Sequence, residues 1–288
     1  MPNDTIGPKI KRFRQKRKLT QDELAAALGY SGKSVISHIE KGDADMTYEK
    51  MLLLLRTYML DANELFDTAE IDKRIDEWRL EQRKGKKVAV YIHGLHGSAK
   101  EADDFGCLKE EYDVVGLDYQ DGNPWELKEA IQAEFEKLTR NYKEVVVIAN
   151  SIGAFYAYEY LSGYDVKHAF FVSPIASMSQ IIFNIMMRER IHHKDLEEKK
   201  LITCQDGTVL SFDFYQHVSN DKDAWDVPTD ILYGSRDELV YIESIADFLE
   251  AHPKARLTIK QGAGHHFHTP EEKEFIKEWI LASLHPRG

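Results

Sequence analysis

Cysteine is scarce in this chain, and no run of apolar residues is long enough to cross a membrane. Only two of the 288 residues are cysteines, Cys107 and Cys204, and they lack the C-x-x-C spacing of a zinc or redox site. No stretch approaches the ~20 apolar residues of a membrane span, and residues 1–18 lack the apolar run of a secretion signal. These absences exclude a disulfide scaffold, and we expect a cytoplasmic protein without a membrane partner.

Glycine and proline are also too few to dominate the chain. With 17 glycines and 8 prolines, the sequence is neither collagen-like nor a proline-rich disordered segment. Apolar residues make up 43% and charged residues 30%, which is typical of a globular protein that buries a core. Because a single domain usually has ~100 to 200 residues, we expect two domains of unequal size.

The net charge of −11 is unevenly distributed. Residues 1–42 carry nine basic and four acidic side chains, whereas residues 88–288 carry 20 basic and 34 acidic ones, a net of −14. A polyanion would be attracted to the first segment and repelled by the second. On charge alone, the simpler interpretation of these basic residues is a solvated helix face. The pattern of residues has to decide whether the segment binds a polyanion.

Residues 1–67 show the apolar spacing and caps of five short helices. The first helix is framed by three apolar positions: Ile10, Phe13 and Leu19. Residues 20–23, Thr-Gln-Asp-Glu, form a capping box that opens a second helix. That helix runs to Leu28, and Gly29 supplies the left-handed residue that ends it.

The third helix follows a tight turn. Ser31 is its predicted N-cap, Gly42 marks its end, and three apolar side chains point inward: Val35, Ile36 and Ile39. Thr47 begins a fourth helix, and residues 61–66 form a brief fifth. Two short helices joined by a tight turn with a glycine are the elements of a helix-turn-helix.

The segment 19–42 closely resembles the helix-turn-helix of the Cro and phage-repressor (XRE-like) family. The positions that match the pattern of this family are Gln21, Leu24, Ala25, Leu28, Gly29, Ser31, Ile36, Ser37, Glu40 and Gly42. The resemblance covers about residues 6–66. It implies a five-helix domain whose third helix enters the major groove of double-stranded DNA.

The resemblance also implies DNA contacts. On the third helix, four residues are candidates for base or phosphate contacts: Lys33, Ser34, Ser37 and His38. Gln21 is a candidate phosphate anchor, with Arg12 and Arg14 adding charge. Arg14 could instead support the fold, and His38 could be an exposed helix residue. DNA-binding domains of this type usually dimerise, so we expect a homodimer. The alternative to a DNA-binding domain is a domain that contacts proteins.

Residues 68–86 form a charged amphipathic stretch between the two predicted domains. Ile71, Ile75 and Trp78 recur at helical spacing, which predicts a linker helix that ends at Gly85. Trp78 could dock one domain on the other or form a dimer seam. Packing in a core is the simpler expectation.

Residues 87–288 alternate between strand-like and helix-like runs. Six strands are predicted, at 88–92, 112–117, 145–149, 169–172, 229–233 and 257–259. Four helices are predicted, at 125–139, 152–161, 241–251 and 270–284. This alternation predicts an α/β domain with a mostly parallel sheet flanked by helices. In such sheets, functional groups collect at the C-terminal ends of the strands.

Four of these strand ends carry small and polar residues. The first strand ends in residues 93–97, His-Gly-Leu-His-Gly, whose glycines let the backbone turn sharply. The third ends in residues 149–153, Ala-Asn-Ser-Ile-Gly, and passes directly into a helix, which is the context of a nucleophile elbow. Asp237 follows the fifth strand, and His265 follows the sixth.

Together, these segments resemble the α/β-hydrolase family. The resemblance implies that Ser151 is the nucleophile, His265 the general base and Asp237 the carboxylate that orients the imidazole. It also implies an oxyanion hole formed by the backbone N–H groups of Leu95 and Ile152. A serine hydroxyl is a poor nucleophile until an imidazole removes its proton, so this chemistry needs the whole set.

The resemblance covers about residues 86–286 and departs from the family pattern at one position. Ala149 stands where G-x-S-x-G has its first glycine. Alanine is the next smallest residue, so we expect the close packing of helix on strand to survive.

The acid and the base both have competing neighbours. Glu238 adjoins Asp237, but an aspartate fits the turn directly after the strand better. His266 adjoins His265, which we prefer because it directly follows the Gly-Ala-Gly turn. A metal site is a weaker interpretation of four histidines that lack the usual spacings and supporting carboxylates: His192, His193, His266 and His268. We therefore expect neither a metal nor a cofactor.

Residues 174–226 are an insertion between strands. The insertion contains an apolar helix-like run at 178–187, a charged run at 188–200 and a predicted hairpin at 201–214 centred on Asp-Gly. In hydrolases of this fold, an insertion at this point commonly forms a cap over the active site. The methionine-rich face suits an adaptable apolar pocket, although such a stripe is more often core.

Three functions remain open on the sequence. In the first, a serine hydrolase of small esters, resembling a carboxylesterase, is fused to a DNA-binding transcription regulator. In the second, the hydrolase-fold domain is a small-molecule sensor for that regulator, with little or no turnover. In the third, the helical domain contacts only proteins. The full serine, aspartate and histidine set favours the first.

Overall fold

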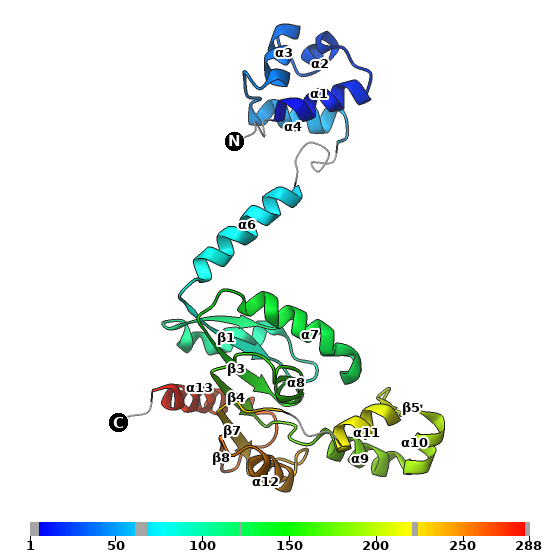
Figure 1. Ribbon diagram of the computed structural model, residues 1–288, viewed down its shortest axis with the longest axis vertical. Coiled ribbons are helices and arrows are strands. Elements are labelled where there is room, and N and C mark those ends of the chain that lie inside the picture. Colours follow the sequence, from blue (N-terminus) through cyan, green and yellow to red (C-terminus); the bar gives the residue numbers. More distant parts are fainter. Residues whose placement is uncertain (1–5, 61–67, 121, 221–223, 286–288) are drawn as a thin grey trace. The chain divides into compact units, whose positions relative to one another are not determined.

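The computed structural model describes residues 6–60, 68–120, 122–220 and 224–285 (Figure 1). The chain divides into two compact units, Met1–Arg79 and Leu80–Gly288. The division falls inside helix α6 (Thr68–Arg83), and each unit has its own core. In the part of the chain that the structure describes, no helix is long and apolar enough to cross a membrane.

Four helices precede α6 among the described residues of the first unit. They are α1 (Ile6–Lys16), α2 (Gln21–Ala27), α3 (Lys33–Lys41) and α4 (Tyr48–Thr57). Their buried faces form one core that includes Ile10, Phe13, Leu24, Leu28, Ile36, Ile39 and Leu54. The fifth helix predicted at 61–66 lies outside the described residues.

The ends of these helices follow the predicted caps with one exception. The Thr20 capping box, the left-handed Gly29 and Gly42, and the Thr47 N-cap are confirmed. The Ser31 N-cap is wrong: Gly32, in extended backbone, precedes α3 and contributes no side-chain hydrogen bond. Helical geometry therefore begins one residue later than the serine would dictate.

Helix α6 leaves two of its three predicted apolar positions in solvent, and the side chain of the third, Ile71, lies outside the described residues. Gly85 has a φ of +79°, the left-handed backbone expected after a helix end. Trp78 is 63% exposed and Ile75 is 41% exposed, so the expectation that Trp78 packs in a core is wrong. All side chains from Asp72 to Arg79 are exposed, so this stretch of the helix buries no face.

The second unit is built on a six-stranded sheet. Its strands are β1 (Lys87–Ile92), β2 (Tyr112–Gly116), β3 (Glu144–Asn150), β4 (His168–Val172), β7 (Thr229–Gly234) and β8 (Ala255–Lys260). The order is β2-β1-β3-β4-β7-β8, and every neighbouring pair is parallel. The six predicted strands are confirmed, with their ends moved by no more than two residues.

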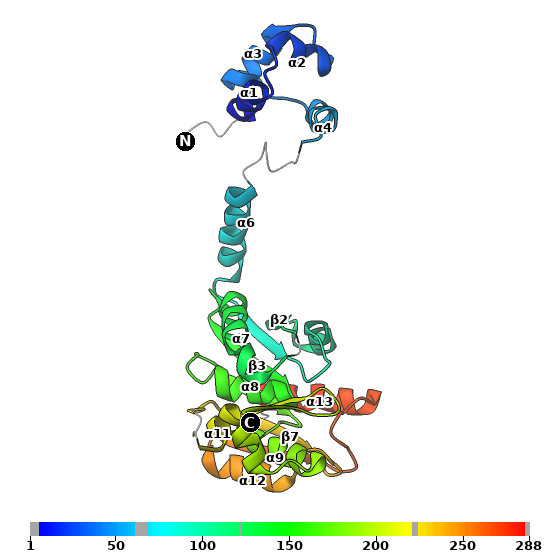
Figure 2. The same cartoon turned by 90° about the vertical axis from the view of Figure 1, so that its right-hand side faces the viewer.

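Helices cover both faces of this sheet (Figure 2). On one face lie α7 (Pro124–Thr139), α8 (Ile152–Tyr160) and α12 (Ile242–Ala251). On the other lie α13 (Pro270–Leu284) and η1 (Ala99–Leu108), a 3-10 helix that the sequence did not predict. Alternate residues of β1 point to the two faces, Val88, Val90 and Ile92 to the first and Ala89 and Tyr91 to the second.

The insertion after β4 forms a group of helices and a hairpin beside the sheet (Figure 1). Its elements are α9 (Met178–Glu189), α10 (His193–Lys199), β5 (Leu201–Thr203), β6 (Val209–Ser211) and α11 (Phe212–Asn220). The predicted apolar helix and hairpin are confirmed, but the hairpin ends at Ser211, three residues before its predicted end, because α11 begins at Phe212. Met178, Ile182 and Met186 are buried, so this face of α9 is core.

Candidate active site and candidate DNA-reading helix

Ser151 stands between the end of β3 and the start of α8. Its φ of 53° and ψ of −117° are rarely adopted by a residue with a side chain, and such backbone strain persists only where the surroundings hold it. Two hydrogen bonds do so: the Ser151 N–H donates to the Val172 carbonyl at 3.0 Å, and the Ile175 N–H donates to the Ser151 carbonyl at 3.1 Å. This sharp turn lifts the hydroxyl off the sheet at the N-terminus of α8.

Small residues allow α8 to start this close to the sheet. A β-carbon on Gly153 would lie 2.4 Å from the carbonyl oxygen of Ile92, so no larger residue fits there without movement. Ala149 is fully buried and pairs with Ile92 and Phe171 in the sheet register. The core therefore accommodates its methyl group at the position where the family pattern has glycine.

His265 connects Ser151 to Asp237. The Nε2 atom of His265 lies 2.9 Å from the Ser151 Oγ, and its Nδ1 atom lies 2.8 Å from the Asp237 Oδ2. Because an ionised carboxylate only accepts hydrogen bonds, Nδ1 carries the hydrogen of a neutral ring and Nε2 presents its lone pair to the hydroxyl. The structure thus brings the three residues singled out from the sequence into one chain of hydrogen bonds. Glu238 and His266, their competitors, are exposed.

The Asp237 carboxylate is held in its ionised form. Its side chain is fully buried, and Oδ1 accepts hydrogen bonds from the backbone N–H groups of Leu239 and Val240, both at 2.9 Å. Burial by itself would raise the pKa of Asp237, but the hydrogen bonds from His265 and these two N–H groups lower it below its usual value. The carboxylate can therefore orient His265 and stabilise positive charge on its ring.

The loop at 93–97 passes directly beside the nucleophile. A β-carbon on Gly94 would lie 3.2 Å from the Ser151 Cβ, a tight contact that a larger residue would make only if neighbouring atoms moved slightly. Among the described residues, neither the Leu95 nor the Ile152 backbone N–H donates a hydrogen bond to another protein group. Both groups predicted to form an oxyanion hole are thus uncommitted within the chain.

His93 also belongs to the site, although its position in the sequence indicated only a turn. Its buried ring lies 2.8 Å, through Nδ1, from the Gly94 carbonyl oxygen and stacks on Tyr119 at 3.9 Å. A carbonyl only accepts, so Nδ1 is the protonated nitrogen. Tyr119 donates its hydroxyl to the His93 carbonyl, and the pair fixes the start of the 93–97 loop. The position of this histidine directly after a buried strand is the feature of the sequence that could have indicated its place in the site.

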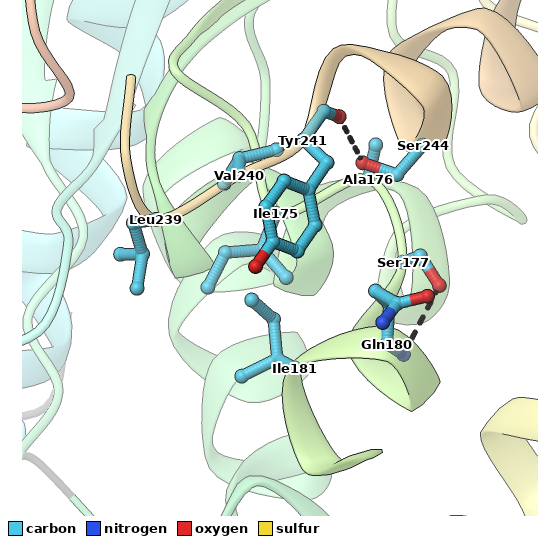
Figure 3. A pocket seen from close by; sticks show the side chains of 9 residues that line it. All are labelled: Ile175, Ala176, Ser177, Gln180, Ile181, Leu239, Val240, Tyr241 and Ser244. Carbon is cyan, nitrogen blue, oxygen red and sulfur yellow. Dashed lines mark hydrogen bonds between the residues drawn. The ribbon is translucent and has the colours of Figure 1, made fainter. Parts of the chain in front are cut away.

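A small pocket connects the insertion to the loop that follows β7 (Figure 3). Residues 175–181 line one side and residues 239–244 the other, and most of the lining side chains are apolar. The pocket adjoins two of the three residues above, because the Ile175 N–H binds the Ser151 carbonyl and the Val240 N–H binds the Asp237 carboxylate. The two segments that line this pocket are thus tied by hydrogen bonds to Ser151 and Asp237.

The four histidines weighed as metal ligands do not gather into such a site. In the parts of the chain that the structure describes, no group of three or more histidine, cysteine, aspartate or glutamate side chains is placed to hold a metal ion. His266 and His268 stack on each other with ring centres 5.7 Å apart, and His192 precedes α10 as its N-cap.

Helix α3 of the first unit exposes three of its four candidate DNA contacts. Lys33, Ser34 and His38 are exposed, and Ser37 is half-buried. Lys33 lies 4.0 Å from Asp22 and His38 lies 3.5 Å from Asp43, and all four side chains are largely in solvent. Such exposed pairs are weak, so these groups can exchange their partners for phosphates or bases.

Arg14 and Gln21 belong to a buried network around Glu40. The Arg14 guanidinium donates to both Glu40 carboxylate oxygens, at 2.6 and 3.0 Å, and the Gln21 amide donates to one of them at 2.9 Å. Burial alone would raise the pKa of Glu40, but these donors lower it. Arg14 therefore supports the fold, which was the alternative to a DNA contact. Gln21 likewise donates one of its two amide hydrogens to Glu40.

Comparisons with known proteins find different matches for the two units. Residues 10–65 match the helix-turn-helix family model. A search of the curated proteins found no match. Among solved structures, Est1E from Butyrivibrio proteoclasticus is similar with a TM-score of 0.55 and 18% identity over 70% of this chain and 89% of that one.

Est1E with ferulic acid bound gives a TM-score of 0.54 at 17% identity, covering 70% of this chain and 90% of that one. The α/β hydrolase domain-containing protein 10 from mouse gives 0.52 at 14% identity, covering 70% and 91%. The second unit has the α/β-hydrolase fold. With the helix-turn-helix match, both resemblances drawn from the sequence are confirmed at the level of fold.

Proposed function

We propose that the second unit is a serine hydrolase of small esters and that the helix-turn-helix joins this activity to a DNA-binding transcription regulator. One observation carries the enzymatic part: an unbroken hydrogen-bond chain runs from the Asp237 carboxylate through His265 to the hydroxyl of Ser151. Both distances are within the range for a nucleophile and its base before substrate binds.

In the first half of the reaction, the Ser151 Oγ forms a bond to the ester carbonyl carbon while its proton moves to the His265 Nε2. The carbonyl π electrons move onto oxygen, and the uncommitted N–H groups of Leu95 and Ile152 donate to that oxyanion. The tetrahedral intermediate then collapses. Its bond to the alcohol oxygen breaks, His265 returns the proton to the leaving alkoxide, and an acyl-serine remains.

In the second half, water takes the place of the alcohol. His265 removes a proton from the water as its oxygen bonds to the acyl carbon, and the same N–H groups stabilise the second oxyanion. The bond to the Ser151 Oγ breaks, and His265 gives the proton back to the serine. The acid is released, and Asp237 stays ionised throughout because its hydrogen bonds favour that form.

The exposed apolar side chains around the pocket beside the insertion support a small ester as substrate. The lining of the pocket includes Ile181 from the insertion and Leu239 and Tyr241 from the loop after β7, and the last two are about half exposed. Such side chains are suited to cover a short apolar group of the substrate, since burying them on binding is favourable.

Activity-based labelling tests the enzymatic proposal. Intact wild-type protein is treated with a fluorophosphonate probe and assayed with p-nitrophenyl acetate, and Ser151→Ala is the matched control. We expect labelling and turnover in the wild type and neither in the variant. Folded wild-type protein that takes up no label and releases no nitrophenol would overturn the enzyme and favour a ligand sensor.

For the first unit, we propose that α3 lies in the major groove of double-stranded DNA, with Lys33, Ser34, Ser37 and His38 at the contact and Gln21 near a phosphate. The chain would act as a homodimer, since readers of this type span two half-sites about one helical turn apart. Binding that neutralises phosphates releases counterions, so affinity should fall steeply with salt. Fluorescence anisotropy with duplexes of pooled genomic sequence measures this. Salt-independent binding, or none, would favour a protein-contact module.

A further inference from the structure

A second cavity, of about 330 Å³, lies on the opposite face of the sheet from α8. Its floor is made by Tyr91, Asn150 and Val172, which stand at or next to the C-terminal ends of β1, β3 and β4. Helices η1 and α13 supply its walls. A volume of this size falls at the lower end of the ~300 to 1,000 Å³ of small-molecule sites. The cavity shares no lining residue with the pocket beside the insertion.

One acidic side chain in the lining of this cavity, Glu101, is held by uncharged donors. The Glu101 carboxylate is half-buried, where it accepts the Tyr91 hydroxyl at 2.7 Å and the Ser98 backbone N–H at 3.1 Å. Among the described residues, it forms no ion pair. The surrounding lining includes Phe105 and Ile276, both buried. A carboxylate in such surroundings gains from a cation that reaches it.

Basic side chains on α13 also line the cavity. Lys277 is half-buried and pairs with the exposed carboxylate of Glu274, at 3.2 Å. Lys273, one turn earlier on this helix, pairs with Asp104 of η1 at 2.8 Å and is also attracted electrostatically to Glu101. The exposed rings of His266 and His268 add further nitrogen atoms. Among the described residues, the lining therefore offers a carboxylate without an ion pair of its own and a weakly paired ammonium group.

We propose that this cavity is a second small-molecule site and that its ligand is a compact zwitterion, an α-amino acid with an apolar side chain. The ammonium group would bind Glu101, and the carboxylate would bind Lys277. The apolar side chain would pack on Phe105, Val172 and Ile276, where burial of apolar surface adds affinity. The site does not depend on the proposed ester hydrolysis.

The position of the site links it to the residues of the proposed reaction. Asn150 directly precedes Ser151, and His266 directly follows His265. Glu101 holds the Ser98 N–H, and Ser98 ends the loop that carries Leu95. A bound amino acid would thus contact three segments that position the nucleophile, the base and an oxyanion donor.

Isothermal titration calorimetry with L-phenylalanine and L-leucine tests the ligand class on the full chain. We expect saturable binding of both amino acids. Two analogues of phenylalanine remove one charge each: 3-phenylpropionate lacks the ammonium group, and phenethylamine lacks the carboxylate. Each should bind at least about tenfold more weakly, because each analogue loses one charged group and its charge-assisted hydrogen bond to the site. No heat with either amino acid, or equal affinity for an analogue, would overturn the proposal.

Two variants locate the binding. Glu101→Gln keeps an acceptor for the Tyr91 hydroxyl but loses the charge, and Lys277→Met leaves the Glu101 hydrogen bonds intact. Each should weaken L-phenylalanine binding by about tenfold or more, whereas Lys254→Met, an exposed lysine paired with Asp226, should not change it. If Glu101→Gln fails to fold, Lys277→Met still tests whether L-phenylalanine binds in this cavity. Unchanged affinity in Lys277→Met would overturn the site.

A last titration separates this site from the proposed active site. Ser151→Ala should bind L-phenylalanine with wild-type affinity, whether or not the wild-type protein hydrolyses esters. Binding that disappears in Ser151→Ala would move the amino acid to the neighbourhood of the nucleophile and overturn the second site. Failure of the hydrolase proposal would leave this affinity untouched, so the two proposals fail independently.

Discussion

A β-carbon on Gly153 would lie 2.4 Å from the carbonyl oxygen of Ile92, so the first turn of α8 rests directly on the end of β1. This contact sets the height of Ser151 above the sheet, since the serine stands two residues before Gly153. The two elements are joined through backbone atoms, which cannot rotate away as a side chain can. The geometry at Ser151 therefore depends on the absence of a side chain at position 153.

Gly153→Ala should lower the free energy of unfolding by about 1 to 3 kcal/mol, because overpacking against backbone forces a shift of helix or strand. Urea denaturation followed by circular dichroism measures the change. Gly106→Ala is the matched control, since a β-carbon there meets no atom within 4 Å. Equal stability of the two variants would show that α8 can move without cost.

Asp237→Asn should reduce kcat for p-nitrophenyl acetate by about 10³- to 10⁴-fold if the proposed hydrolysis is correct, because the amide no longer holds the productive tautomer of His265. The steady-state rate is the measurement, with thermal unfolding as a check of the fold. Glu238→Gln is the control, since Glu238 is exposed and adjacent. A full rate in Asp237→Asn, or an equal loss in Glu238→Gln, would contradict the assignment of the acid.

The sheet was predictable because its strands are apolar on both faces. Runs such as 88–92 and 145–149 consist of valine, isoleucine, alanine and one tyrosine, and only a strand buried on both sides needs such a continuously apolar composition. Parallel strands place their C-terminal ends on one edge. Residues in the loops after these strands, such as Asp237 and His265, could therefore be expected to meet before any distance was known.

What could not be predicted depends on contacts between distant segments. Residues 99–108 form η1, but a 3-10 helix has no apolar period of 3.6 residues to reveal it. A glycine that is required by close packing looks like any other: a β-carbon on Gly7 would lie 2.0 Å from the Ile39 carbonyl oxygen, 32 positions further along the chain. The pairing of Arg14 with Glu40 is equally invisible in the sequence, which left open whether the arginine adds charge for DNA binding or supports the fold.

Asp230 should stabilise the second unit in a pH-dependent manner. Its buried carboxylate accepts hydrogen bonds from His168 at 2.9 Å and from Arg256 at 2.9 and 3.1 Å. Burial alone would raise the pKa of Asp230, but these bonds and one from Ser283 lower it below its usual value. Asp230→Asn should therefore cost about 1.5 to 3 kcal/mol of unfolding free energy at pH 7.

The sign of the pH effect follows from the lowered pKa. Since the folded state binds this proton less readily than the unfolded state, the stabilisation is fully present above the unfolded pKa of about 3.9 and is lost as the pH falls through the folded value. The gap between wild type and Asp230→Asn should thus be constant near neutral pH and close in acid. Denaturation of both proteins from pH 7 to pH 3 measures it, with the exposed Asp226→Asn as control. A gap that widens in acid would refute the assignment.

Arg14→Ala and Lys33→Ala should both weaken DNA binding, for different reasons. Arg14 is 13% exposed and Glu40 3% exposed, so loss of the arginine leaves a buried carboxylate with Gln21 as its remaining donor and costs about 3 to 5 kcal/mol. That is a large share of the stability of a small unit. Lys33 is in solvent, so its loss should spare the fold and lower the salt dependence of binding by about one phosphate contact.

Hydrogen–deuterium exchange of the full chain distinguishes these two causes. In Arg14→Ala, the amides of α1, α2 and α3 should exchange faster, because the core around Ile10, Leu24 and Ile36 opens together. In Lys33→Ala, the same amides should keep wild-type protection while anisotropy reports weaker binding. Arg14→Ala with unchanged protection and reduced affinity would instead make Arg14 a direct DNA contact, since only the loss of a phosphate interaction could then explain the weaker binding.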